Sequence, residues 1–238
     1  MSKQFYTPAL AKIAERIRTQ IESASTPDSR HNYSRQILSK ADQLATCVKS
    51  LASQHKNPSP TVSVGYSDAQ IGKNAKRLRV IATQIDTGTR AIATEGSAAL
   101  TAAINKKARL VPDKFAPEIR QAFRGMKMQD KIAYMDEAIK RADGPGLSAV
   151  IDAPEVLTGL PGEMSGRFRL LCETTAAPQE VAERELLQTV WADCQAAIDA
   201  ARQAAVAFHD PARLREIEQG EKAAELAAEE FRAAAVVG

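Results

Sequence analysis

A heptad repeat in residues 71–103 constrains the fold of this 238-residue chain more than any other feature of its sequence. Its two rows lie four positions apart, and they read Ile71, Leu78, Ile85, Ile92 and Ala99 in one row and Ala75, Ala82, Thr89, Gly96 and Ala103 in the other. This spacing places both rows on one face of an α-helix, and the small residues allow a partner helix to approach closely. We therefore predict a helix-packing seam formed by Ile71, Ala75, Leu78, Ala82, Ile85, Ile92 and Gly96.

Two shorter apolar patterns precede this helix. The first reads Tyr6, Leu10, Ile13, Ile17 and Ile21, and the second reads Ile37, Ala41, Leu44, Val48 and Leu51. Steps of three and four residues are typical of one helix face. We predict three helices in residues 5–109, with the second and third forming an antiparallel hairpin. The connector 61–66 is expected to be extended, with a helix cap at Ser67 or Asp68. The first helix packs either on this hairpin or on a neighbouring chain.

Proline and glycine divide the rest of the chain into shorter elements. Pro117 begins a helix that reaches Ile139, with Gly125 as a candidate break, and Asp-Gly-Pro-Gly at 143–146 interrupts the chain. Pro178 opens a long acidic helix to Phe208, and a final helix runs from about residue 211. We predict an all-α fold with an N-terminal antiparallel helical bundle (1–110), a middle region of short helices (111–176) and a C-terminal pair of acidic, Ala-rich helices (177–238).

Composition agrees with close helix packing and with an origin in a reducing cytoplasm. Aromatic residues make up only 5% of the chain, which disfavours a sheet built from aromatic and β-branched residues. The three cysteines are too few and too scattered for a disulfide framework. No apolar run approaches the roughly 20 residues of a membrane span, and the N-terminus lacks the apolar segment of a signal peptide.

The charges divide the chain into a basic front and an acidic rear. Residues 1–141 carry 24 Lys and Arg against 12 Asp and Glu, whereas residues 142–238 carry 8 against 17. This asymmetry is typical of proteins that bind nucleic acid, an acidic partner or a neighbouring copy. Two basic clusters lie early in the heptad helix and at its end, and we expect them to contact phosphates or an acidic partner: Lys73, Lys76, Arg77 and Arg79, and then Lys106, Lys107 and Arg109. The alternative interpretation is a solvated helix face, with the second cluster favoured by the helix dipole.

Nothing in the sequence indicates a catalytic, cofactor or metal site. The glutamates of residues 216–230 have no histidine at ligand spacing, and the three histidines stand alone near helix ends. Cys194 lies on the apolar stripe of its helix beside Trp191 and Ile198, where a small core residue is expected. The glycines of residues 144–166 match neither a P-loop nor a nucleophile elbow. We predict a protein that is not an enzyme and has no cofactor.

Residues 130–175 carry a pattern that resembles a known group of proteins. It consists of the helix Ile132–Ile139, the turn Asp143-Gly144, the segment Leu147–Val150, and Ala153-Pro154 leading into Leu157-Thr158-Gly159-Leu160. The pattern resembles that of uncharacterised helical proteins of tailed bacteriophages and prophages. The resemblance covers about a fifth of the chain and implies a virion-associated or assembly role, with no catalytic residues to carry over.

These observations lead to two functional hypotheses. The preferred one is a structural or assembly protein that forms homo-oligomers or binds other virion proteins, with register set by helix packing and by basic and acidic surfaces. Such a protein is made in the cytoplasm and incorporated into a virion. The alternative is a nucleic-acid-associated protein that binds phosphates without sequence preference. No aromatic residues interleave with the basic clusters, which disfavours a single-strand stacking platform.

Overall fold

The computed structural model is built from helices. It describes residues 6–25, 31–56, 64–111, 113–209, 212, 215–216, 219–220 and 222–228. Within these residues every regular element is a helix, which confirms the predicted all-α fold class. None of the described helices combines the length and the apolar composition needed to cross a bilayer.

Two compact units make up the chain, and each combines segments that are distant in sequence. Unit 1 consists of Met1–Ser23, Asn32–Ile92 and Thr189–Gly238, and unit 2 consists of Ala24–His31 and Ala93–Gln188. Most of unit 2 is thus inserted in the sequence between the second and third segments of unit 1. The sequence predicts three consecutive segments, 1–110, 111–176 and 177–238, because a sequence alone does not reveal which distant segments pack together.

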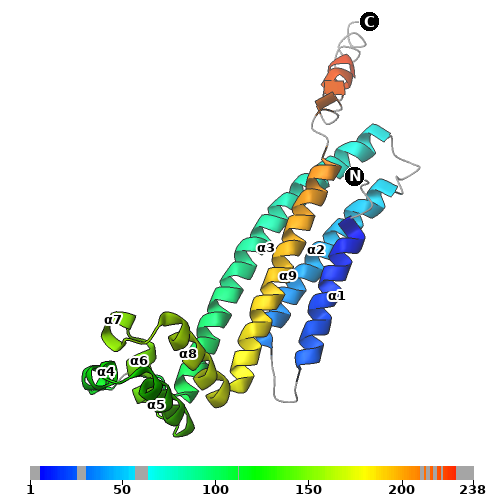
Figure 1. Cartoon of the computed structure of the whole chain (residues 1–238). Helices are drawn as coiled ribbons and strands as arrows, with labels where there is room; N and C mark the ends of the chain where they lie inside the picture. Colours follow the sequence, from blue (N-terminus) through cyan, green and yellow to red (C-terminus); the bar gives the residue numbers. More distant parts are fainter. Residues whose placement is uncertain are drawn as a thin grey trace, which may run out of the picture. The chain divides into compact units, whose positions relative to one another are not determined.

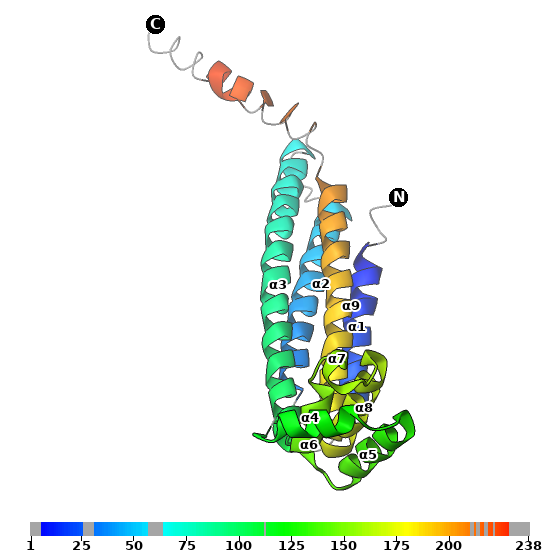
Figure 2. The ribbon, with the colours of Figure 1, turned by 60° about the vertical axis from the view of Figure 1, so that its left-hand side comes forward.

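Four of the described helices form a bundle in unit 1. They are α1 (Tyr6–Ala24), α2 (Asn32–Lys56), the first part of α3 (Val64–Lys107) and the second part of α9 (Pro178–Phe208). Figures 1 and 2 both show these four segments side by side. The α3 helix begins at Val64, so the prediction of an extended connector is wrong for residues 64–66, and the helix starts before the caps predicted at Ser67 or Asp68.

Polar contacts join each pair of neighbouring helices around this bundle. They are Arg18 to Asp42 between α1 and α2 at 3.1 Å, Asn74 to Gln54 between α3 and α2 at 2.9 Å, Arg202 to Asp86 between α9 and α3 at 2.7 Å, and Arg16 to Asp193 between α1 and α9 at 2.6 Å. The first helix therefore packs in the bundle of its own chain, which resolves the alternative left open by its sequence. Helix α9 closes the bundle as its fourth member.

Apolar stripes form the interior of unit 1. All five residues of the predicted stripe of α2 are buried, as are Leu10, Ile17 and Ile21 of α1 and Val190, Cys194 and Ile198 of α9. Burial of each large aliphatic side chain contributes about 1.5–3 kcal/mol to the stability of the fold. The bundle thus has a continuous apolar interior that needs no second chain.

Unit 2 is a cluster of short helices packed around α6. Its elements, besides the adjoining parts of α3 and α9, are α4 (Ala116–Arg124), α5 (Met128–Lys140), α6 (Gly144–Ile151), α7 (Glu155–Thr158) and α8 (Gly162–Ala176). Gly125 does separate two helices, α4 and α5. Helix α6 packs against α4, α5 and α8, and seven of its eight residues are buried. Its N-terminus is capped by Asp143, whose carboxylate accepts the Gly146 N–H at 3.0 Å.

Two glycines of unit 2 occupy positions that other residues do not fit. A Cβ at Gly144 would collide with the main-chain carbonyl groups of Ala108 and Arg109, so α6 approaches the end of α3 only because this residue has no side chain. Gly159 ends α7 with a φ of 61°, in the left-handed region. The predicted final helix from residue 211 lies largely outside the described residues, although 222–228 are helical.

Candidate functional site

The exposed charges of α3 in unit 1 are all positive among the side chains that the structure describes. Between residues 64 and 92, the exposed charged residues whose side chains are described are Lys73, Lys76, Arg77, Arg79 and Arg90. We call these five residues the basic face of α3. They span about 25 Å along the helix axis at 1.5 Å per residue. Both carboxylates in this stretch, Asp68 and Asp86, are only half-exposed, so the outermost surface of the helix carries cations alone.

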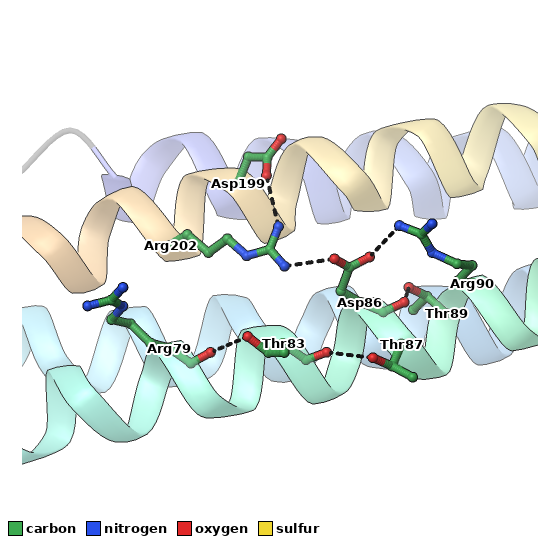
Figure 3. Close-up of polar contacts among 8 residues, drawn as sticks. All are labelled: Arg79, Thr83, Asp86, Thr87, Thr89, Arg90, Asp199 and Arg202. Carbon is green, nitrogen blue, oxygen red and sulfur yellow. Dashed lines mark hydrogen bonds and ion pairs between the residues drawn. The ribbon is translucent and has the colours of Figure 1, made fainter.

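Four of these cations have no carboxylate partner. Among the residues that the structure describes, Lys73, Lys76, Arg77 and Arg79 form no ion pair. The intervening Thr83 and Thr87 are also exposed, and their hydroxyl groups donate to the carbonyl oxygens of Arg79 and Thr83 at 3.0 and 3.2 Å (Figure 3). These hydroxyl protons are used within the helix, so the ammonium and guanidinium groups remain as the strong donors of this face.

Asp86 is the exception to the basic surface, and it is neutralised inside the bundle. Arg202 of α9 donates to its carboxylate at 2.7 Å, and Arg90 lies 3.6 Å from the other oxygen (Figure 3). The hydrogen bond from Arg202 holds the pKa of Asp86 below its usual value, against the opposing effect of burial. The same contact raises the pKa of Arg202. Asp86 is therefore committed to the α3–α9 contact and does not offset the cations outside it.

The second predicted basic cluster lies in unit 2 and is partly paired. Lys107 contacts Glu180 at 2.7 Å, and this hydrogen bond lowers the pKa of Glu180. Lys106 and Arg109 are exposed and form no ion pair with a described residue. Arg109 stands just beyond the end of α3 with a positive φ of 54°. The two clusters thus belong to different units, and only Lys73, Lys76, Arg77 and Arg79 form a continuous unpaired set.

Most of the predicted packing seam is buried by its own chain. Ile71, Ala75, Leu78, Ala82 and Ile85 are each at most 7% exposed in the bundle of unit 1. Gly96 is buried in unit 2, whereas Ile92 is half-buried. Since burial requires no second chain, these residues leave little apolar surface on α3 for a neighbouring copy.

The buried row of α3 changes register along the helix. From residue 71 to residue 89 it follows the heptad, and from there it continues through Ala93, Gly96, Leu100, Ile104 and Ala108, close to 3.6 residues per turn. Ala99, which continues the strict seven-residue row, is exposed. A straight α-helix drifts by about 20° per heptad, so a strict heptad leaves the buried side after a few turns.

An apolar groove in unit 2 was not predicted from the sequence. It has a volume of about 570 Å³ and is lined by Ile132 and Asp136 of α5 and by Met164, Arg167, Phe168, Leu170, Leu171 and Thr174 of α8. We call it the α5–α8 groove. Leu170 and Leu171 are 49% and 47% exposed, which is high for adjacent leucines on one helix. Only the run Phe168, Leu170 and Leu171 signals this surface in the sequence, and such a run equally suits a core helix.

Unit 2 also contains two buried charges that sequence reasoning missed. Lys131 is 5% exposed, and its ammonium group donates to the carbonyl oxygens of Thr158 and Gly159 at 2.8 and 3.1 Å. Glu173 is 3% exposed and pairs with Arg184 at 2.5 Å and with Arg169 at 3.5 Å. Both charges satisfy their hydrogen bonds within unit 2, which identifies them as structural rather than ligand-binding groups.

Cys172 and Cys194 are free cysteines buried in the two units. Burial raises the pKa of the Cys194 thiol to about 12, and burial followed by the nearby Glu173 carboxylate raises that of Cys172. A thiol with such a pKa is protonated at neutral pH and is a poor nucleophile. Within the part of the chain that the structure describes, no three His, Cys, Asp or Glu side chains cluster as metal ligands.

Comparison of the chain with protein-family models, with curated proteins and with solved structures found no match. The resemblance of residues 130–175 to helical phage proteins thus stays a prediction.

Proposed function

We propose that this chain is a non-enzymatic assembly protein that works in multiple copies and binds an acidic surface of a neighbouring molecule through the basic face of α3. The observation that carries the proposal is the set of unpaired cations at Lys73, Lys76, Arg77 and Arg79 on a helix held rigidly in a closed bundle. A row of fixed like charges raises the local concentration of a partner of opposite charge and orients it during encounter.

The structure changes the mechanism expected from the sequence. The residues of the heptad seam are largely buried, and part of the basic front pairs with the acidic rear inside the chain, as in Arg16 to Asp193 and Lys107 to Glu180. Copies that associate therefore use charges that remain on the surface rather than the seam. Placement of such an assembly in a phage particle rests on the sequence pattern of residues 130–175 alone.

The α5–α8 groove favours a protein partner over a nucleic acid. Apolar surface of the kind formed by Ile132, Leu170 and Leu171 is buried by other apolar side chains, and a phosphate backbone offers none. The basic face also contains no aromatic residue on which a base could stack.

Association measured against salt tests the proposal. Sedimentation velocity at about 50 mM and about 500 mM NaCl is expected to show assemblies that dissociate as salt rises, because exposed charge contacts are screened. A monomer at every concentration in low salt would contradict it.

Non-specific nucleic-acid binding is the second candidate function, and the absence of any exposed carboxylate among the described side chains of α3 in unit 1 favours it. It predicts that nuclease-treated protein retains duplex DNA with an affinity that falls steeply with salt. DNA binding by a protein that stays monomeric would support the nucleic-acid-binding function. Self-association without DNA binding would support the assembly function.

A further inference from the structure

We propose that the α5–α8 groove is the docking site for the C-terminal helical segment, residues 222–228, of a second copy of this chain. The inference extends the proposed assembly role, but it uses a surface in unit 2 that shares no residue with the basic face of α3. The two proposals can therefore fail separately.

The groove combines an apolar floor with two unpaired charges. Ile132, Met164, Phe168 and the two leucines supply the apolar lining, and Asp136 and Arg167 supply one carboxylate and one guanidinium. Both charged residues are exposed, and neither forms an ion pair with a described residue. An occupant that fits must offer an apolar side chain together with one positive and one negative group.

The segment 222–228 offers this combination. It is helical, and every one of its side chains is exposed. Leu226 is 60% exposed, so its apolar side chain lies mostly in solvent. Lys222 lies three residues before Glu225 and four before Leu226, so it neighbours both on the helix surface. Glu225 and Leu226 are adjacent in sequence and lie on either side of Lys222.

The small side chains and the two charges of the segment suit the groove. The other residues of the segment are Ala223, Ala224, Ala227 and Ala228, and small side chains let the helix backbone approach a groove closely. Lys222 then faces Asp136 and Glu225 faces Arg167, while Leu226 enters the apolar floor. Helices with one apolar face bind grooves of this kind in many complexes.

Cysteine cross-linking between two different variants tests the docking directly. A chain carrying Leu171→Cys is mixed with a chain carrying Leu226→Cys and oxidised, and we expect a disulfide-linked dimer in several-fold excess over the control pair Val156→Cys with Leu226→Cys. Val156 is also an exposed apolar residue, but it lies on α7 and does not line the groove. Equal yields from the two pairs would overturn the inference.

Docking of the segment in its own chain is a separate outcome. The double variant with Leu171→Cys and Leu226→Cys in one chain would then give a cross-linked monomer whose yield is independent of concentration. That result would overturn the assignment to a second copy.

Charge exchange provides the second test and does not depend on a reactive cysteine. In a background that carries Lys73→Glu, Lys76→Glu and Arg77→Glu, which removes the basic face of α3, Arg167→Glu places two carboxylates together, and we expect about tenfold weaker association at low salt, where exposed charges are not screened. Mixing this variant with a Glu225→Lys chain is expected to restore the affinity. Failure of the pair to recover, with the helical circular dichroism unchanged, would contradict the charge match. If only the assembly through the basic face of α3 fails, the expected effect of Arg167→Glu on groove binding stays the same.

Discussion

Individual charged residues of this chain have roles that their sequence context does not reveal. Lys131 and Lys140 both lie on α5, yet the first is 5% exposed against two carbonyl oxygens and the second is exposed. The carbonyl groups that receive Lys131 belong to residues 158 and 159, more than twenty positions away. The periodicity of apolar residues predicts which side of a helix is buried. It does not predict which distant groups contact that side.

Replacement of Lys131 by methionine tests its structural role. Lys131→Met retains most of the side-chain volume but leaves the carbonyl oxygens of Thr158 and Gly159 without their donor, and we expect a loss of about 1–3 kcal/mol in the free energy of unfolding. Urea unfolding followed by circular dichroism measures this loss. The matched control Lys140→Met should stay within about 0.5 kcal/mol of the parent protein. A similar stability for both variants would contradict the assigned role.

The Asp86–Arg202 contact makes the stability of the bundle depend on pH. The folded state lowers the pKa of Asp86, so its contribution is present above the unfolded pKa of about 3.9 and is lost as the pH falls through the lower folded value. Asp86→Asn is expected to reduce the free energy of unfolding by about 1–2 kcal/mol at pH 7, and the difference from the parent protein should shrink in acid.

Thermal unfolding from pH 7 down to about pH 2 measures the effect of Asp86. Asp199→Asn is the control, since Asp199 also contacts Arg202 but is 65% exposed and contributes little. A stability difference for Asp86→Asn that does not change with pH would exclude the carboxylate as its cause.

At the scale of elements, helices were easier to predict than their partners. The apolar stripes of α1, α2 and α9 identified those helices because a 3.6-residue period depends only on neighbours in sequence. The role of α9 in the bundle was missed, because its contact from Arg202 to Asp86 joins residues 116 positions apart. The heptad row correctly predicted the buried side of α3 up to residue 85. It also placed Ala99 on that side, although Ala99 is exposed, because sequence spacing does not show which distant helices cover α3.

The change of register along α3 predicts opposite results for two alanine substitutions. Ala82 is fully buried, so Ala82→Leu overpacks the bundle and should reduce the free energy of unfolding by about 1–3 kcal/mol. Ala99 belongs to the strict heptad row but is exposed, so Ala99→Leu should change it by less than about 0.5 kcal/mol. Equal destabilisation by both variants, measured by chemical unfolding, would show that the heptad row is buried throughout.

At the scale of the whole molecule, the division into a basic front and an acidic rear has two consequences. Some of these charges meet inside the two units and stabilise them, as Arg16 with Asp193 and Lys107 with Glu180 show. Other cations stay unpaired on the surface, among them Lys73, Lys76, Arg77 and Arg79 on α3 and Arg35, Lys49 and Lys56 on α2. The sequence predicted the basic cluster at residues 73–79. It could not predict that Lys107 pairs with Glu180 or that residues 106–109 belong to unit 2, because both depend on contacts between distant segments.

Charge reversal on α3 tests the central proposal most directly. The variant Lys73→Glu, Lys76→Glu, Arg77→Glu is compared by sedimentation velocity at about 50 mM NaCl with the control variant Arg35→Glu, Lys49→Glu, Lys56→Glu. The control changes the net charge equally on α2, at residues that are exposed and form no ion pair with a described residue. We predict that the parent protein and the control assemble, whereas the α3 variant sediments as the parent protein does in high salt. Assembly of the α3 variant to the same extent as the parent protein at low salt would contradict the account.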